Sequence, residues 1–196
     1  RDIELTDKDV LEVGSGRGGG ASWIARTYSP ASLVALDYSL EAVKLCTQLY
    51  ANQETLEFIE GNAMSLPFKP SSFDVVYNVE SSHCYSDMNA FIKSVYSTLR
   101  PGGTFAWTDF REKKKMDKIH QMFIDSGFEI IKESNITSEV LNALDQISDD
   151  KKERIGKSTS RVIRRSFETF AGVRGTPVYQ SFQKGTLQYY RYLLRK

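Results

Sequence analysis

A glycine-rich segment from Val10 to Ala25, VLEVGSGRGGGASWIA, has the residue types of a ligand-binding loop. Glu12 lies in the apolar run, and Gly14, Gly16 and Gly18 follow it at every second position. Glycines let a backbone approach a ligand, and the helix that follows such a loop offers unpaired N–H groups. A buried glutamate is costly unless it faces a cation or a donor. The segment therefore predicts a small-molecule site, with a simple strand-to-helix turn as the alternative.

Two further polar positions come at the ends of the next apolar runs. Asp37 ends SLVALD, where a carboxylate can accept hydrogen bonds from both ribose hydroxyls of a nucleoside. Asn62, in EGNAMSLPF, can bond an adenine edge through its side-chain amide, with the Ala63 backbone amide beside it. The Gly-Lys-Ser/Thr of a phosphate-binding loop is absent, and a dinucleotide fingerprint needs no acid before its glycines. These positions favour a cofactor that contains a nucleoside.

Short apolar runs alternate with helical periodicity and predict the elements that position these residues. Because continuous apolar runs suit a sheet covered on both faces, the alternation predicts a doubly wound α/β fold with a mainly parallel sheet. The helix over 87–99 is expected to stop at Pro101 in RPGG. Strands are expected at 9–13, 32–37, 55–60, 73–78, 103–110, 127–134 and 186–196, and helices at 19–28, 40–51, 87–99 and 113–126.

The chain is expected to form a single globular domain, 1–196, because a length of 196 residues suits one domain. Polar amphipathic helices over about 138–171 read as an insertion before the last strand. Because the first strand begins almost at once, we also expect that an N-terminal lid over the site is missing from this chain.

Composition narrows the range of partners. A formal net charge of +1 argues against a general nucleic-acid binder, since neutralising phosphates requires a surplus of Lys and Arg. Cys46 and Cys84 are too few for a disulfide framework or a zinc cluster, which favours a reducing, cytoplasmic setting and no metal. No apolar run reaches the ~20 residues of a membrane span.

Five motifs in order carry a resemblance to a known family: E-x-G-x-G-x-G, the acid after the second strand, GNAMSLPF, SFDVVYNVESSH and LRPGG. Together they resemble the class I S-adenosylmethionine-dependent methyltransferases over essentially the whole chain. The resemblance implies a Rossmann-like sheet of seven strands whose last strand is antiparallel. It also implies S-adenosyl-L-methionine as cofactor and S-adenosyl-L-homocysteine as product.

The resemblance assigns roles to individual residues. Asp37 would hold the ribose, Tyr38 would flank the adenine, and Asn62 stands where the family commonly has Asp, so it keeps an acceptor but loses the charge. The full set of expected cofactor-binding residues is Glu12, Gly14, Ser15, Gly16, Gly18, Asp37, Tyr38, Asn62, Ala63 and Asn78.

His83 and Glu80 are the candidate catalytic residues. The resemblance places the end of the fourth strand beside the sulfonium, so both side chains should border the substrate. A neutral histidine suits a general base near pH 7, and a nearby carboxylate can orient its ring. A capping or packing role for His83 is the alternative, and His120, on an amphipathic helix, is expected to be structural. Phe167, Phe170 and Tyr179 are candidates for an apolar acceptor pocket.

The sequence also favours one class of acceptor. NVES after the fourth strand lacks the Asn/Asp-Pro-Pro-Tyr box of methylases that act on base amines. NVESSHCY resembles instead the subgroup that methylates lipophilic natural products such as polyketides and glycolipid precursors. We therefore expect methyl transfer to a small or medium lipophilic molecule, at a hydroxyl. The alternatives are a carbon methylase of sterol or terpene type, with Glu80 and aromatics stabilising a carbocation, and a non-catalytic cofactor-binding partner protein.

Overall fold

The structure is a computed structural model that describes residues 3–146 and 175–196. Its contacts divide the chain into two compact units. Unit 1 contains the chain up to Asp109 together with Lys118–Glu133 and Arg191–Lys196, and unit 2 contains Phe110–Asp117 and Ser134–Tyr190. All the residues expected in the cofactor site or in catalysis lie in unit 1. Unit 1 is therefore the part of the fold that positions the site.

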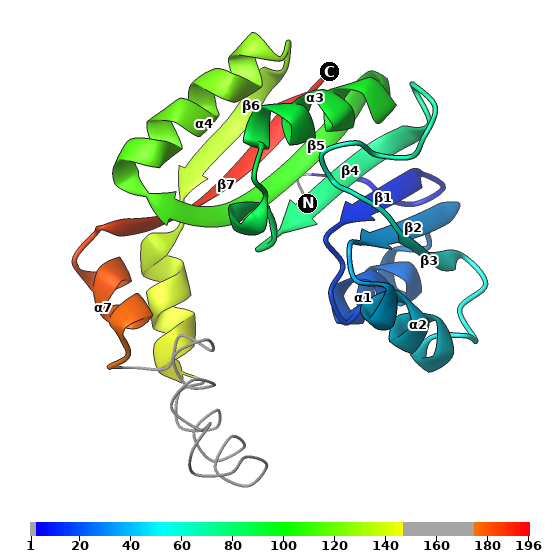
Figure 1. Ribbon diagram of the computed structural model, residues 1–196, viewed down its shortest axis with the longest axis horizontal. Helices are drawn as coiled ribbons and strands as arrows, with labels where there is room; N and C mark the ends of the chain where they lie inside the picture. Colours follow the sequence, from blue (N-terminus) through cyan, green and yellow to red (C-terminus); the bar gives the residue numbers. More distant parts are fainter. Residues whose placement is uncertain (1–2, 147–174) are drawn as a thin grey trace, which may run out of the picture. The chain divides into compact units, whose positions relative to one another are not determined.

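Seven strands form one sheet in the order β3-β2-β1-β4-β5-β7-β6 (Figure 1). The order reverses beside β1, because β2 and β3 extend the sheet to one side and β4 begins the other. In such sheets ligands bind beyond the carboxyl ends of the strands at this point. The strands are β1 (Asp9–Val13), β2 (Ser32–Asp37), β3 (Leu56–Glu60), β4 (Phe73–Val79), β5 (Leu99–Glu112), β6 (Glu129–Asn135) and β7 (Leu187–Arg195).

Strands β1 to β5 pair in parallel, whereas β7 runs against β5. The Gly102 N–H donates to Lys196 O at 2.9 Å, and the Lys196 N–H donates to Gly103 O at 3.0 Å. These bonds place the end of β7 beside the beginning of β5. The expectation of a doubly wound, seven-stranded sheet with an antiparallel last strand is confirmed.

Helices cover both faces of the sheet in unit 1 (Figure 1). One face packs on Ala21, Ala25, Val43 and Cys46, which belong to the first two helices. The other face has an aromatic core in which the ring of Phe105 lies 5.9 Å from that of Phe91 and 6.0 Å from that of Phe123. The helices are α1 (Gly19–Tyr28), α2 (Leu40–Leu49), α3 (Met88–Thr98), α4 (Lys113–Asp125) and α7 (Pro177–Gln183), with a 3-10 turn η1 (Ser82–Cys84).

The segment RPGG differs from the expectation. We expected a turn at Pro101 and a strand over 103–110, but β5 already begins at Leu99. The register between β4 and β5 shifts between Phe73 and Val75, so the extra residues bulge out of the ladder without ending the strand. A bulge tolerates a proline, which has no N–H to give to the ladder.

The expected insertion is described only in part. Residues 137–146 are helical, and the rest of 138–171, including Phe167 and Phe170, lies outside the described residues. The helix α7 was not expected from the sequence, because its seven residues are too few to show helical periodicity. The Thr176 hydroxyl caps it by accepting from the Tyr179 N–H at 3.5 Å, and Pro177 occupies its first turn. The Tyr179 hydroxyl donates to Asp145 Oδ1 at 2.6 Å within unit 2, and its ring is buried.

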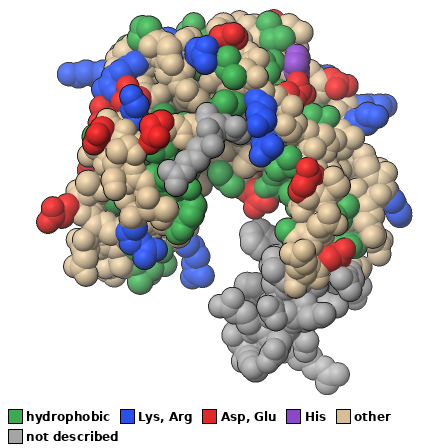
Figure 2. Space-filling view, turned by 180° about the vertical axis from the view of Figure 1, so that it is seen from behind, with side chains coloured by type: hydrophobic (Ala, Val, Ile, Leu, Met, Phe, Trp, Pro, Cys, Tyr) green, Lys and Arg blue, Asp and Glu red, His purple; other side chains and the backbone are tan. Residues whose placement is uncertain are grey.

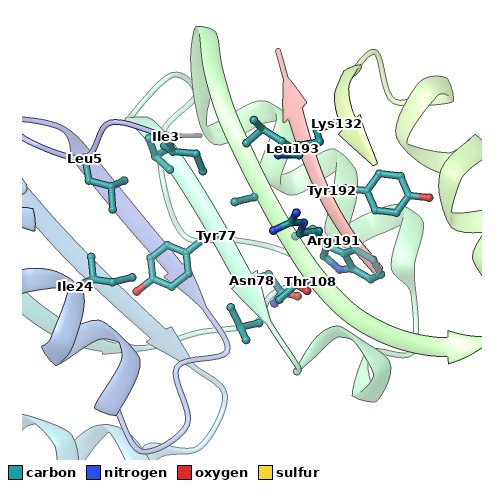
Figure 3. Close-up of a pocket in the computed structure, with 14 residues that line it drawn as sticks. Ile3, Leu5, Ile24, Tyr77, Asn78, Thr108, Lys132, Arg191, Tyr192 and Leu193 are labelled. Carbon is teal, nitrogen blue, oxygen red and sulfur yellow. The ribbon is translucent and has the colours of Figure 1, made fainter. Parts of the chain in front are cut away.

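A groove of about 290 Å³ lies on the face of the sheet that α1 also covers. Side chains from β4, β5 and β7 face it, and Ile3, Leu5 and Ile24 line one side (Figure 3). Val75, Tyr77 and the other strand residues make it mainly apolar, and all of its lining belongs to unit 1.

Charged side chains of both signs are interspersed on the surface seen in Figure 2. Within residues 3–146 and 175–196, no helix combines the length and apolar character required to cross a membrane. The same described ranges contain no group of three or more His, Cys, Asp or Glu side chains placed to hold a metal ion.

Candidate active site

The glycine loop joins the end of β1 to α1 at the carboxyl edge of the sheet. Leu36 O accepts hydrogen bonds from the N–H groups of Gly14 (2.8 Å) and Ser15 (3.1 Å), which ties the loop to β2. Gly18 has φ 69°, and a Cβ on it would lie 2.6 Å from the Phe58 ring. A side chain at Gly18 would therefore displace the loop from its packing against Phe58 of β3 and Cys46 of α2.

Asp37 stabilises the same loop from β2. One carboxylate oxygen accepts from the Gly16 N–H at 2.7 Å, and the other accepts from the Ser39 N–H at 2.9 Å. Each oxygen has two lone pairs, so this bracing leaves acceptor capacity for ribose hydroxyls. Asp37 thus has a position that suits its expected role and also holds the loop in shape.

Glu12 is 6% exposed and lies opposite Tyr77 in the β1–β4 pair. Burial raises the pKa of its carboxyl to about 8, an effect that the nearby Tyr77 hydroxyl opposes and the Asp37 charge strengthens. The Tyr77 hydroxyl is close enough to influence the pKa, but its geometry falls short of a hydrogen bond. We regard the two groups as neighbours that interact electrostatically.

Buried polar atoms that lack a partner gather around this loop. Within the described residues, five such side-chain atoms occur, and four of them belong to Glu12 (Oε2), Ser15 (Oγ), Tyr77 (OH) and Asn78 (Oδ1). Leaving a buried polar atom unpaired costs about 1–3 kcal/mol. Their gathering at one place is the pattern of a site shaped for a polar ligand, and a cofactor with an amino group and hydroxyls fits it.

The expected adenine contacts lie at the ends of β2 and β3. Tyr38 is 81% exposed, so its ring is available to a ligand. The side-chain oxygen of Asn62, Oδ1, accepts from the Met64 N–H at 2.9 Å, and Ala63 is buried beside it. The turn therefore uses the oxygen that we expected to contact the adenine edge, and the role of Asn62 stays a prediction.

His83 bonds to Asp109, a residue that the sequence analysis did not single out. Asp109, on β5, is fully buried, and its Oδ1 lies 2.9 Å from His83 Nδ1. Its Oδ2 accepts from the Ser82 hydroxyl at 2.7 Å and from the His83 N–H at 2.9 Å. The Trp107 indole donates to the same Ser82 hydroxyl at 2.9 Å. About a third of the His83 side chain remains exposed.

Glu80 lies directly after β4, at a sharp turn of the chain. It has the left-handed φ of 49° at the sharp turn after β4, and its N–H donates to Thr108 O at 3.0 Å. Such a conformation costs a non-glycine residue about 1 kcal/mol, and it redirects the chain so that His83 comes to lie over Asp109. The carboxylate that orients the His83 ring is Asp109, and a catalytic role for Glu80 stays a prediction.

A doubly wound sheet with acids at the ends of β1 and β2 around a glycine loop is typical of proteins that bind a ligand containing a nucleoside. A protein-family model described as a methyltransferase domain matches residues 11–107. The phthiotriol/phenolphthiotriol dimycocerosates methyltransferase of Mycobacterium leprae is 35% identical, and the match covers 99% of this chain and 72% of that protein. The fatty-acid O-methyltransferase of Mycolicibacterium smegmatis is 32% identical, with 98% and 69% covered.

A solved structure agrees with the fold. Phosphoethanolamine N-methyltransferase 2 of Haemonchus contortus, in complex with S-adenosyl-L-methionine, superposes with a TM-score of 0.83 at 18% identity, covering 99% of this chain and 50% of that one. The chain belongs to the S-adenosylmethionine-dependent methyltransferases. It is an enzyme whose cofactor is S-adenosyl-L-methionine.

Proposed function

We propose that this methyltransferase acts on an oxygen atom of a lipophilic acceptor, at a hydroxyl. The observation that carries the proposal is the bond between His83 and the buried Asp109 at the carboxyl end of the sheet. The relatives from Mycobacterium leprae and Mycolicibacterium smegmatis are named for lipid acceptors, and the second is named as an O-methyltransferase.

The cofactor supplies a methyl group already activated on sulfur, so the protein must hold the acceptor in line and receive its proton. A hydroxyl becomes a better nucleophile as its proton leaves, and a neutral imidazole takes that proton well near pH 7. Asp109 accepts from His83 Nδ1 and so selects the tautomer in which Nε2 has the lone pair. His83 Nε2 is then the atom that receives the acceptor's proton.

The remaining residues hold the cofactor. We propose that Asp37 accepts from the ribose hydroxyls, that Glu12 faces the amino group, and that Tyr38 stacks on the adenine. The bracing of Asp37 by Gly16 and Ser39 supports the first role. The buried, unpartnered Oε2 of Glu12 supports the second, and the exposure of the Tyr38 ring supports the third.

The test is an acceptor panel with 1-dodecanol, 4-dodecylphenol, dodecanoic acid and 1-dodecene, with products identified by mass spectrometry. Ethers from the first two would establish a hydroxyl acceptor, whereas an ester would move the acceptor class to carboxylates. A methylated alkene would favour a carbon methylase. Binding of the cofactor without any product would instead favour the non-catalytic alternative.

The role of His83 has its own variant. His83→Ala should lower kcat by about 100-fold or more, the usual contribution of a general base, while the Kd for S-adenosylmethionine stays within about twofold. His120→Ala is the matched control, because His120 pairs with Glu133 on the α4 side of the sheet. Near-normal turnover in His83→Ala would remove this residue from the mechanism.

A further inference from the structure

The segment after β4 is fastened directly to the first turn of the glycine loop. The Asn78 amide, fully buried, donates to Val13 O at 2.8 Å and to the Ser81 hydroxyl at 2.6 Å. The Ser81 hydroxyl lies 3.3 Å from the same Val13 O and 2.9 Å from the Tyr85 hydroxyl. We call Asn78, Ser81 and Tyr85 the bracket.

Gly14 shows how closely the two segments approach. A Cβ added to this residue would lie 2.2 Å from Ser81 Oγ and 2.9 Å from the Tyr85 hydroxyl oxygen. No side chain can occupy that space, so the first glycine of the loop makes room for the bracket. The other side of Tyr85 is fixed as well, because its ring packs edge-on at 4.9 Å against the fully buried Phe91 of α3.

The bracket joins two parts of the reaction that lie on separate strands. The loop after β1 belongs to the cofactor site, and the segment after β4 contains both Ser81 and His83. Methyl transfer is sensitive to the alignment of donor and acceptor, and a misplacement of about 1 Å can cost on the order of 100-fold in rate. A direct hydrogen-bonded link is a short route by which the fold can set that distance.

We propose that Ser81 and Tyr85 are positioning residues for methyl transfer, which hold the Gly14 turn, and with it the bound methyl donor, against the segment that contains His83. The proposal deepens the proposed function and rests on its methyl transfer, although not on the identity of the acceptor. Burial raises the pKa of the Tyr85 hydroxyl to about 12, so the group keeps its proton at neutral pH and can donate within the bracket.

The experiment compares Tyr85→Phe and Ser81→Ala with the wild type and with Tyr96→Phe. Tyr96 is a matched control, because its ring packs on Phe128 and Lys196 in the α3 region and makes no contact with the bracket. Calorimetry gives the Kd for S-adenosylmethionine. The carbon-13 resonance of bound [methyl-13C]S-adenosylmethionine reports the surroundings of the methyl group, and kcat is measured with whichever panel compound is methylated.

Tyr85→Phe and Ser81→Ala should each lower kcat by about tenfold, an alignment loss smaller than that for a 1 Å shift. Each should also shift or broaden the bound methyl resonance, with Kd within about twofold and Tyr96→Phe unchanged. An unchanged methyl resonance in both bracket variants would overturn the proposal, as would a rise in Kd with kcat at saturating cofactor unchanged. If no panel compound is methylated, the acceptor proposal fails, and the methyl resonance still decides the role of the bracket.

Discussion

Glu12 and Asp109 are two buried carboxyl groups in unit 1, and they differ in their hydrogen-bond partners. Asp109 accepts hydrogen bonds from the Ser82 hydroxyl and the His83 backbone N–H, and its Oδ1 lies 2.9 Å from His83 Nδ1. Glu12, at 6% exposure, has an Oε2 without a partner among the described residues. Asp109 therefore has protein donors at both of its oxygens, whereas one oxygen of the Glu12 carboxyl group, Oε2, is left without a donor.

The contrast distinguishes two uses of a buried acid. A carboxylate whose lone pairs are satisfied within the protein fixes its neighbours, and its removal leaves their donors unpaired. A buried carboxyl group with an oxygen that has no donor is unstable as an anion, so it stays protonated and can lose its proton when a cationic ligand binds. We expect substitutions of Asp109 to damage both the fold and turnover, and substitutions of Glu12 to change chiefly the pH dependence of cofactor binding.

The largest effect is expected for Asp109→Ala. It would leave the Ser82 hydroxyl and the two His83 N–H groups without their acceptor, so the free energy of unfolding should fall by about 3 kcal/mol. Turnover should fall by about 100-fold, since the His83 tautomer is no longer fixed. Urea unfolding and kcat measure the two losses. Asp87→Ala is the control, because Asp87 only caps α3 from an exposed position. If Asp109→Ala matched this control in both measurements, the contrast with Glu12 would fail.

Asp37→Ala tests the cofactor site at a carboxylate that already accepts hydrogen bonds from the protein backbone. The variant would lose the braces to Gly16 and Ser39 as well as the expected ribose contacts. The Kd for S-adenosylmethionine should rise by about 100-fold, since hydrogen bonds to a charged group contribute about 1.5–3 kcal/mol each. Calorimetry measures it, with the exposed Glu57→Gln on β3 as control. An unchanged affinity would contradict the assignment of Asp37 to the ribose.

The carboxyl groups of Glu12 and Asp109 also show how much of the site could be predicted from the sequence. Acids at the ends of apolar runs are conspicuous, and Glu12 also precedes a run of glycines, so Glu12 and Asp37 were identifiable. Their strands followed from the alternation of apolar runs and helices. The pairing of Asp109 with His83 was not identifiable, because it joins residues 26 apart through the register of β4 on β5, where Val79 lies opposite Thr108. An acid at the end of the fifth apolar run was the available signal.

Gly14 makes the same point for a residue that was identified but only partly understood. Its type predicted a close approach of the backbone to a ligand, which stays a prediction, and the structure shows a close approach to another part of the chain. The neighbour that needs the space is Ser81, far along the chain, and only the folded sheet brings it within 2.2 Å of a Cβ at Gly14. The local sequence indicates that no side chain fits at Gly14. Which residue fills that space is determined by the topology of the sheet, which brings Ser81 there.

Glu12 should couple cofactor binding to pH. Burial raises its pKa from an ordinary 4.5 to about 8, so the carboxyl group is protonated at pH 7 before binding. An ammonium group beside it favours the ionised form, and binding should release a proton. The apparent affinity should therefore rise up to about tenfold per pH unit below pH 8 and level off above it. Calorimetry at pH 7 in buffers of different ionisation enthalpy counts the proton. Equal heats in all buffers would show that Glu12 does not change its protonation state.

Glu12→Gln provides the companion measurement on the protein without cofactor. The folded state binds one more proton than the unfolded state between pH 4.5 and about 8, because the folded pKa lies above the ordinary value. This contribution to stability is present below pH 4.5 and is lost as the pH rises through the folded pKa. The wild type should lose stability relative to Glu12→Gln across that window in urea unfolding. Parallel pH profiles would show that the carboxyl group titrates normally.

The smallest expected effect is at Tyr77, which lies directly opposite Glu12 in the β1–β4 pair and whose hydroxyl lowers the Glu12 pKa. Tyr77→Phe removes that influence but keeps the ring, so the Glu12 pKa should rise further. The pH at which cofactor affinity levels off should then move upward, and the affinity at pH 7 should fall by about two- to threefold, equivalent to less than half of a pH unit. The two binding curves should meet well above pH 8, because Glu12 is ionised there in both proteins. A uniform loss of affinity at every pH would instead mean that the Tyr77 hydroxyl contacts the cofactor directly. The unpaired Oε2 of Glu12 would then no longer explain how Glu12 differs from Asp109.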